Sequence, residues 1–234
     1  MWFPLISATV IPTALFGSSI RSFDLWRVYP ALQTVRNVLS GMDLTPIFPR
    51  RSSSIHHQPT TTMPAALRAA IRDVVDFPEP GIIFKDITPI LADAALFRRA
   101  IDLLCETTGG AKIDKVAGID ARGFIFAAAV ADRLGTGFVP IRKKGKLPWK
   151  TRQLAYALEY GEAVVELHED AVKPGEKVLL VDDLLATGGT AAAAATLLEE
   201  LGADLTGISF LIELSFLNGR AKLDPRPIHS ILTY

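Results

Sequence analysis

Residues 178–190 read VLLVDDLLATGGT, and this segment constrains the fold more than any other part of the chain. Its first four residues are apolar, with the length and composition of a buried parallel strand. Asp182 and Asp183 follow directly, and the small-residue loop 186–190 then leads into an alanine-rich helix. This order predicts a strand end, an acidic pair and a helix N-terminus close together at one edge of a sheet.

Such an arrangement favours a site for a phosphorylated sugar. Unpaired backbone N–H groups at a helix N-terminus attract phosphate, and two carboxylates can bind ribose hydroxyls or a hydrated cation. Taken singly, a Gly-Gly loop or an aspartate pair is as often a solvated polar loop. The segment is neither a Walker loop, because no Gly-Lys-Ser/Thr follows, nor a GxGxxG dinucleotide motif.

Helical and strand-like patterns alternate from Met63 to the C-terminus. The predicted helices are 65–77, 94–107, 124–134 and 190–201. The predicted strands are 115–119, 138–142, 163–168, 177–181, 205–213 and 228–232. Residues 82–91 are expected to be extended or irregular, and 143–153 to form a polar loop outside the core. The alternation predicts an α/β fold with an open, mostly parallel twisted sheet flanked by helices. Ligands bind such sheets at the carboxyl ends of the strands, where Asp182 and Asp183 lie.

The first 62 residues differ in composition from the rest. They contain no lysine or glutamate, and Asp24 and Asp43 are their only acids. The opening residues could be a signal or membrane segment, but they lack a basic n-region and are interrupted by prolines. The composition also suggests an organelle transit peptide. We favour a start site placed too far upstream, with Met63 as the native first residue. We therefore predict an N-terminal extension, 1–62, that is disordered or not native, and one domain, 63–234.

Charge and cysteine content narrow the possible partners and compartment. The chain has 25 basic and 25 acidic residues, which does not suggest a protein that coats nucleic acid. Its single cysteine, Cys105, excludes an internal disulfide and is typical of a reducing compartment. Cys105 lies in a helical pattern, so we interpret it as a small core residue and not as a nucleophile.

Two further segments carry charge after predicted strands. Residues 119–124, IDARGF, place Arg122 between a strand and a helix, where a guanidinium can bind pyrophosphate through two hydrogen bonds. Residues 142–146 hold four cations in five positions. Such a run is either a solvated surface loop or a mobile flap that closes over an anion and excludes water.

Together these segments resemble the adenine phosphoribosyltransferases, a group within the type I phosphoribosyltransferases. The matching stretches are FPEPGIIFKDITPIL, GIDARGFIF, PIRKKGKLP, LEYG, AVKPGEKVLLVDDLLATGGT and LIELSFLNGRAKL. The resemblance runs from about Leu67 to the C-terminus. It implies a sheet with a small base-binding hood, and transfer of the phosphoribosyl group of phosphoribosyl pyrophosphate (PRPP) to N9 of adenine, giving AMP and pyrophosphate. It further implies Mg²⁺ held mainly through PRPP with no direct protein ligand, and a cytoplasmic homodimer that binds neither nucleic acid nor membrane.

The resemblance also implies a role for each matching residue. The 5′-phosphate would be bound by Ala186, Thr187, Gly188, Gly189 and Thr190, and the ribose hydroxyls by Asp182 and Asp183. Pyrophosphate would face Arg122, Arg142, Lys143 and Lys146, some of them supplied by a neighbouring subunit. Adenine would lie among Ile83, Phe84, Lys85 and Leu184. Glu159, with Tyr160 beside it on the flap, would be the catalytic acid/base.

Two features depart from the family pattern. Lys85 stands where arginine is common, and the 62-residue extension is foreign to the family. One alternative is a phosphoribosyltransferase for xanthine, hypoxanthine or orotate. Another is a PRPP-sensing regulator that binds DNA, but residues 1–62 lack the amphipathic helices of a helix-turn-helix. An inactive structural protein is disfavoured because every motif keeps its charged residues.

Overall fold

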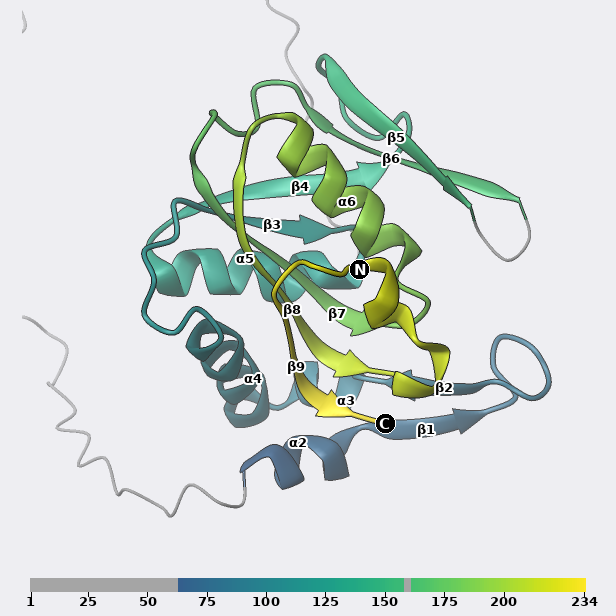
Figure 1. Cartoon of the computed structure of the whole chain (residues 1–234). Coiled ribbons are helices and arrows are strands. Elements are labelled where there is room, and N and C mark those ends of the chain that lie inside the picture. Colours follow the sequence, from purple (N-terminus) through teal and green to yellow (C-terminus); the bar gives the residue numbers. More distant parts are fainter. Residues whose placement is uncertain (1–62, 158–160) are drawn as a thin grey trace, which may run out of the picture. The chain divides into compact units, whose positions relative to one another are not determined.

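The computed structural model describes residues 63–157 and 161–234. These residues form a seven-stranded sheet in the order β5-β6-β4-β3-β7-β8-β9 (Figure 1). The strands are β3 (Lys115–Ile119), β4 (Gly137–Lys143), β5 (Thr151–Ala157), β6 (Glu162–His168), β7 (Lys177–Leu185), β8 (Asp204–Glu213) and β9 (Ile228–Thr233). The neighbouring strands β4, β3, β7, β8 and β9 pair in parallel, whereas β6 pairs antiparallel with β4 and β5. The predicted α/β class with a mostly parallel sheet is confirmed.

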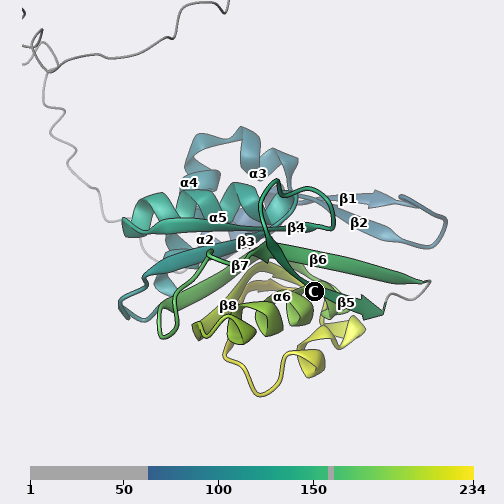
Figure 2. The same ribbon diagram turned by 90° about the horizontal axis from the view of Figure 1, so that it is seen from above.

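Helices cover both faces of this sheet (Figure 2). They are α2 (Met63–Ala70), α3 (Thr88–Ala92), α4 (Ala94–Glu106), α5 (Arg122–Leu134) and α6 (Gly189–Glu200). Leu179 and Val181 of β7 pack in the core shared with α4 and α5, whereas Val178 and Leu180 pack in the core shared with α6. A strand covered on both faces needs apolar residues in succession, which explains the uninterrupted run at 178–181. Among the described helices, none is long and apolar enough to cross a membrane.

The predicted helix 65–77 is only partly correct. The helix α2 ends at Ala70, and residues Arg72–Val75 form the strand β1. This strand pairs antiparallel with β2 (Ile83–Asp86) in a separate two-stranded sheet. The strand β2 carries Ile83, Phe84 and Lys85 of the predicted adenine site, whereas Leu184 lies on β7. The β-branched residues Val74 and Val75 suit a strand as well as a helix, and pairing with a distant partner decides between them.

Two further predictions on the sheet need correction. Residues 151–153 do not belong to the predicted polar loop, since they begin β5, an edge strand that pairs with β6 along its whole length. Edge strands tolerate polar residues because one side faces solvent, so polarity was a poor guide there. The strand β7 also runs to Leu185, which places Asp182 and Asp183 inside it and not after it. By contrast, α5 ends as predicted at Gly135, which adopts a left-handed conformation.

Candidate active site

A cavity of about 350 Å³ lies at the carboxyl ends of β3 and β7. It is lined by Ile119, Asp120, Ala121, Arg122 and the continuous stretch from Asp182 to Ala191. Most of the residues predicted to bind the phosphorylated sugar therefore surround one cavity. Its position at the carboxyl edge of a parallel sheet is the one expected for a ligand site in this fold class.

The loop before α6 presents free backbone donors to this cavity. The helix begins at Gly189, and its first turn has no side-chain cap. The first N–H groups of a helix have no acceptor within the helix, and the helix dipole adds a partial positive charge there. Gly188 has φ 78°, and a Cβ at this position would lie 2.3 Å from the carbonyl oxygen of Gly219. Both observations explain why glycine occupies position 188. The uncapped first turn of α6 leaves backbone N–H groups that are suited to an anion.

The two aspartates of the cavity are tightly packed. Asp183 is only 4% exposed, and its backbone N–H donates to Oδ1 of Asp182 over 2.9 Å. A Cβ added at Gly123 would lie 2.4 Å from the same Oδ1, so glycine is what lets the start of α5 approach the carboxylate. Burial, reinforced by the charge of Asp183, raises the pKa of Asp182 well above its ordinary value. The fold thus holds a carboxylate pair that gains from hydrogen-bond donors or a cation.

Arg122 joins this pair to the predicted base-binding hairpin. Its Nε lies 3.0 Å from Oδ2 of Asp183, and its guanidinium carbon lies 5.1 Å from the ring centre of Phe84. Burial raises the pKa of Asp183, and the nearby Arg122 charge opposes that rise. Oδ2 of Asp183 is buried without a well-aligned hydrogen-bond donor among the described residues, so it keeps its accepting capacity for a ligand.

A second pocket of about 220 Å³ shares Ile119, Asp120 and Thr190 with the first. Arg142 and Lys143 line it at the end of β4. Arg142 Nε donates to Oδ2 of Asp120 over 2.9 Å. On the other side, Thr190 Oγ1 donates to the hydroxyl of Tyr156 over 3.0 Å. Two of the predicted pyrophosphate ligands therefore lie beside residues 186–190, the loop predicted to bind phosphate and called the phosphate loop below.

The basic loop after β4 is held by a buried carboxylate. Glu166 of β6 is only 2% exposed and accepts hydrogen bonds from the backbone N–H groups of Lys146 and Leu147 at 2.9 and 3.0 Å. Burial opposes ionisation of Glu166, but these backbone hydrogen bonds outweigh it and lower its pKa. Arg142 Nη1 also donates to the carbonyl of Lys146 over 3.0 Å. The loop's backbone is therefore ordered by a charge that the sequence did not single out.

Some predicted site residues lie away from the two pockets. Lys146 is exposed, and its side chain lines neither cavity. Lys85 lies on β2, where its Nζ donates to Asp73 over 2.7 Å and sits 4.2 Å from the ring centre of Tyr234. Ile83 is 53% exposed on the same strand. Glu159 and Tyr160 lie outside the described residues, so their predicted roles stay predictions.

Three residues of the site were missed in the sequence. Asp120 lies within the IDARGF segment, and its place at a strand end beside Arg122 was a usable signal. Tyr156 gave no usable signal in the sequence, because the strand β5 that carries it was itself not predicted. Glu166 lies in an apolar strand, where an isolated acid is a weak hint of a buried charge with several donors.

The cavity contains carboxylate oxygens that could contact a hydrated cation. Within residues 63–157 and 161–234, no three His, Cys, Asp or Glu side chains are arranged to hold a metal ion. The cavity does offer the carboxylate oxygens of Asp182 and Asp183. Magnesium keeps several waters and is commonly bound by one or two carboxylates together with substrate phosphates. The donor set therefore fits a magnesium ion that enters with a phosphorylated substrate.

The sequence profile of the phosphoribosyl transferase domain matches residues 85–225. The adenine phosphoribosyltransferase of Anaeromyxobacter dehalogenans (strain 2CP-1) is 58% identical over 169 residues, which is 72% of this chain and 98% of that relative. The chain belongs to the adenine phosphoribosyltransferases. The crystal structure of the adenine phosphoribosyltransferase from Thermoanaerobacter pseudethanolicus superposes with a TM-score of 0.71 at 50% identity, covering 73% of this chain and 99% of that one.

A eukaryotic member of the family has the same fold. The adenine phosphoribosyltransferase of Saccharomyces cerevisiae matches with a TM-score of 0.69 at 41% identity, covering 73% of this chain and 98% of that one. That crystal structure is a complex with adenine and an imino-altritol bisphosphate. The resemblance drawn from the motifs is therefore confirmed at the level of family and fold.

Proposed function

We propose that the cavity between β3 and β7 is where this chain performs its family's reaction. It transfers the 5-phosphoribosyl group of PRPP to N9 of adenine and forms AMP and pyrophosphate. The observation that carries the proposal is the joint position of the uncapped start of α6 and the pair Asp182 and Asp183 in one cavity of about 350 Å³. Such a cavity recognises both ends of a ribose 5-phosphate: an anion and a vicinal diol.

The phosphate and ribose roles follow from donor and acceptor chemistry. The N–H groups of residues 186–190 donate to the 5′-phosphate, as at other helix N-termini. The ribose 2′- and 3′-hydroxyls donate to Asp182 and Asp183, whose pKa values are raised chiefly by burial, so that donors from a ligand would favour their ionised forms. Two fixed ends hold the sugar still, which lowers the entropic barrier to reaction at its anomeric carbon.

The cations beside the cavity stabilise the leaving group. As the bond from the anomeric carbon to pyrophosphate breaks, negative charge grows on the departing oxygens. Arg122 and Arg142 are paired in the described structure with Asp183 and Asp120, and pyrophosphate would recruit both guanidiniums. Lys143 and Lys146 add charge from the end of β4 and the basic loop. When bound, Mg²⁺ would supply further neutralisation of the phosphate charge.

The base would be held by the hairpin β1–β2. The Phe84 ring lies 5.1 Å from the Arg122 guanidinium, at the border between this hairpin and the sugar cavity. Adenine would stack on that ring, with the backbone of Ile83 and Lys85 reading its edge and Leu184 packing on its other side. Glu159 stays the proposed acid/base, with Tyr160 beside it, and would accept or steer the purine proton during bond formation.

Assembly and location are part of the same proposal. Val75, Phe77, Ile82 and Ile83 are large apolar residues on or beside the hairpin, and each is at least 44% exposed. Clustered exposed apolar side chains are typical of subunit interfaces, which supports a homodimer. The single cysteine supports a reducing compartment, in keeping with a cytoplasmic location. Sedimentation velocity of the full chain tests the dimer, which a monomer at micromolar concentration would contradict.

The function is tested by product formation with one base at a time. The full chain is incubated with PRPP, Mg²⁺ and adenine, hypoxanthine, xanthine or orotate, and the nucleotide is separated by chromatography. AMP is expected from adenine, at least about 100-fold faster than nucleotide from the other bases, because a site that hydrogen-bonds one base edge rejects bases with a different edge. Equal rates with hypoxanthine, or no nucleotide from folded protein, would contradict the proposal.

A further inference from the structure

The segment after β8 packs its backbone directly against the phosphate loop. This segment contains the short 3-10 helices η2 (Ser215–Leu217) and η3 (Gly219–Lys222). A Cβ at Gly219 would lie 2.1 Å from the carbonyl oxygen of Ala186, while a Cβ at Gly188 would lie 2.3 Å from the carbonyl oxygen of Gly219. Gly219 does not have positive φ, so contact and not conformation requires glycine there. The two backbones therefore fix each other's position.

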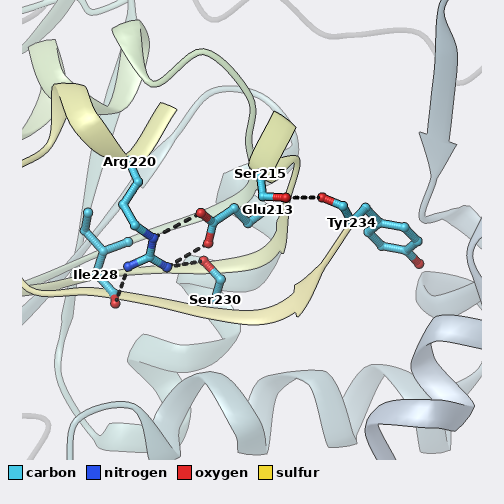
Figure 3. Close-up of polar contacts among 6 residues, drawn as sticks. All are labelled: Glu213, Ser215, Arg220, Ile228, Ser230 and Tyr234. Carbon is cyan, nitrogen blue, oxygen red and sulfur yellow. Dashed lines mark hydrogen bonds and ion pairs between the residues drawn. The ribbon is translucent and has the colours of Figure 1, made fainter. Parts of the chain in front are cut away.

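The next residue anchors this segment to the sheet (Figure 3). Arg220 donates from Nε and Nη2 to the two carboxylate oxygens of Glu213 at 3.0 and 2.7 Å. It also donates to the carbonyl of Ile228 at 3.2 Å and to Oγ of Ser230 at 3.3 Å. Glu213 is only 6% exposed, and its hydrogen bond from Arg220 is the main reason why its pKa is lowered. A paired guanidinium of this kind fixes orientation as well as position.

The ion pair between Arg220 and Glu213 is attached to the strands that carry the site. Glu213 ends β8 and is the register partner of Leu185 in β7, the residue directly before the phosphate loop. The N–H of Leu214 donates to the carbonyl of Leu185 over 2.9 Å. Contacts therefore connect the sheet to the loop that starts at Ala186: Glu213 binds Arg220, and the neighbouring Gly219 touches that loop. Gly219 contacts the loop at Ala186 and Gly188.

We propose that Arg220 is a positioning residue for PRPP. By holding Gly219 against Ala186 and Gly188, it keeps the N–H groups of the phosphate loop in the geometry that binds the 5′-phosphate. The inference rests on the proposed function, since it assigns a support to that same phosphate site. A supporting residue of this kind acts on affinity for the phosphorylated ligands, because a loop that must be ordered on binding loses affinity.

The test compares Arg220 with a matched ion pair elsewhere in the chain. Arg226 makes the same two-point contact with Glu199 at 2.8 and 2.6 Å, but near the C-terminal end of α6 and away from the loop. In Arg220→Gln, the KM for PRPP and the Kd for AMP are expected to rise about tenfold, because the loss of a hydrogen bond to a charged group changes an equilibrium constant by about tenfold or more. Arg226→Gln should leave both constants within about twofold of the wild type, since its partners Glu199 and Thr196 lie in α6 beyond the first turn that faces the phosphate.

Two readouts separate positioning from general destabilisation. At saturating PRPP, the KM for adenine should be unchanged in Arg220→Gln, and Arg220→Lys should recover part of the PRPP affinity. A purely structural role would lower the folded fraction and apparent turnover without changing the KM for PRPP. An unchanged KM for PRPP in Arg220→Gln, or an equal rise in Arg226→Gln, overturns the inference.

A second variant covers the case in which Arg220→Gln does not fold. Gly219→Ala places a Cβ against the backbone of Ala186 and Gly188, and Gly137→Ala is its control because the nearest atom to a Cβ there lies at 3.8 Å. A higher KM for PRPP in Gly219→Ala alone supports the inference, and equal constants in both variants overturn it. Failure of the wild type to bind PRPP is a different result, which would remove the proposed function as well.

Discussion

Replacing Glu166 with glutamine is expected to release the basic loop after β4. Oε1 of Glu166 accepts from the N–H groups of both Lys146 and Leu147, while Oε2 accepts from Thr151 Oγ1 at 3.2 Å and from Gln153 Nε2 at 3.1 Å. The glutamine side chain has only one oxygen. Its NH2 group would take the position of the second carboxylate oxygen and would face hydrogen-bond donors there. Either the two loop amides or the two β5 side chains therefore lose their acceptor.

The size of the effect follows from these contacts. Glu166 is only 2% exposed, which limits how much water can take the place of the lost acceptor. Two hydrogen bonds to a charged group, at about 1.5–3 kcal/mol each and partly offset by relief of the buried charge, give a loss of about 2–4 kcal/mol in the free energy of unfolding. The KM for PRPP should also rise, because the loop carries Lys146 and fixes Arg142 through its carbonyl.

The pH dependence gives the prediction its sign. The pKa of Glu166 is lowered in the folded state from an ordinary value of 4.5. Its contribution to stability is therefore fully present above that ordinary value and disappears as the pH falls through the lowered folded pKa. Wild type and Glu166→Gln should differ most at neutral pH and converge in acid. Urea unfolding across this range measures the difference, with Glu162→Gln, an exposed position on the same strand, as the control.

Two outcomes would refute this reasoning. A difference in unfolding free energy below about 0.5 kcal/mol at neutral pH would place Glu166 among ordinary surface positions. A difference that persists unchanged in acid would mean that the ionised carboxylate is not what holds the loop.

Three further predictions concern the sugar cavity and the pocket beside it. Asp182→Asn should raise the free energy of unfolding, because it removes a carboxylate whose ionisation is opposed by burial. It should also lower turnover at least about 100-fold, because the ionised carboxylate is needed to hold the ribose hydroxyls. Its gain in thermal stability should grow as the pH rises from 3.8 towards the raised folded pKa, since the native state holds the proton longer than the unfolded chain does. Gly123→Ala should weaken PRPP binding in a calorimetric titration, since its Cβ would lie 2.4 Å from Asp182 Oδ1. Tyr156→Phe should raise the KM for PRPP by a factor of about 2–10 through loss of the Thr190 hydrogen bond, with the KM for adenine unaffected.

Much of the site could be predicted because its chemistry lies in contiguous segments. A buried strand, two aspartates and a Gly/Thr loop follow one another in residues 178–190, and local geometry brings them into one cavity. Arg122 could be predicted for the same reason, since it begins a helix shortly after a strand. The helix end at Gly135 needed only the left-handed preference of glycine.

The remaining features depend on contacts between distant segments. Residues 72–75 become a strand because β2 pairs with them, which no local pattern of Val74 and Val75 encodes. Glu166 matters because two loop amides point at it, and Gly219 matters because it touches Ala186. Such roles are set by tertiary approach, so a single sequence predicts the residues of the phosphate loop but not its supports.

The most direct test of the account is a calorimetric titration of PRPP into the full chain with Mg²⁺ present. We expect saturable binding to one site per chain, and binding weakened at least about tenfold in the folded double variant Asp182→Asn/Asp183→Asn, which keeps the loop but loses both carboxylate charges. If the folded wild type takes up no PRPP, or if the double variant binds it equally well, the carboxylate pair and phosphate loop are not the sugar-phosphate site.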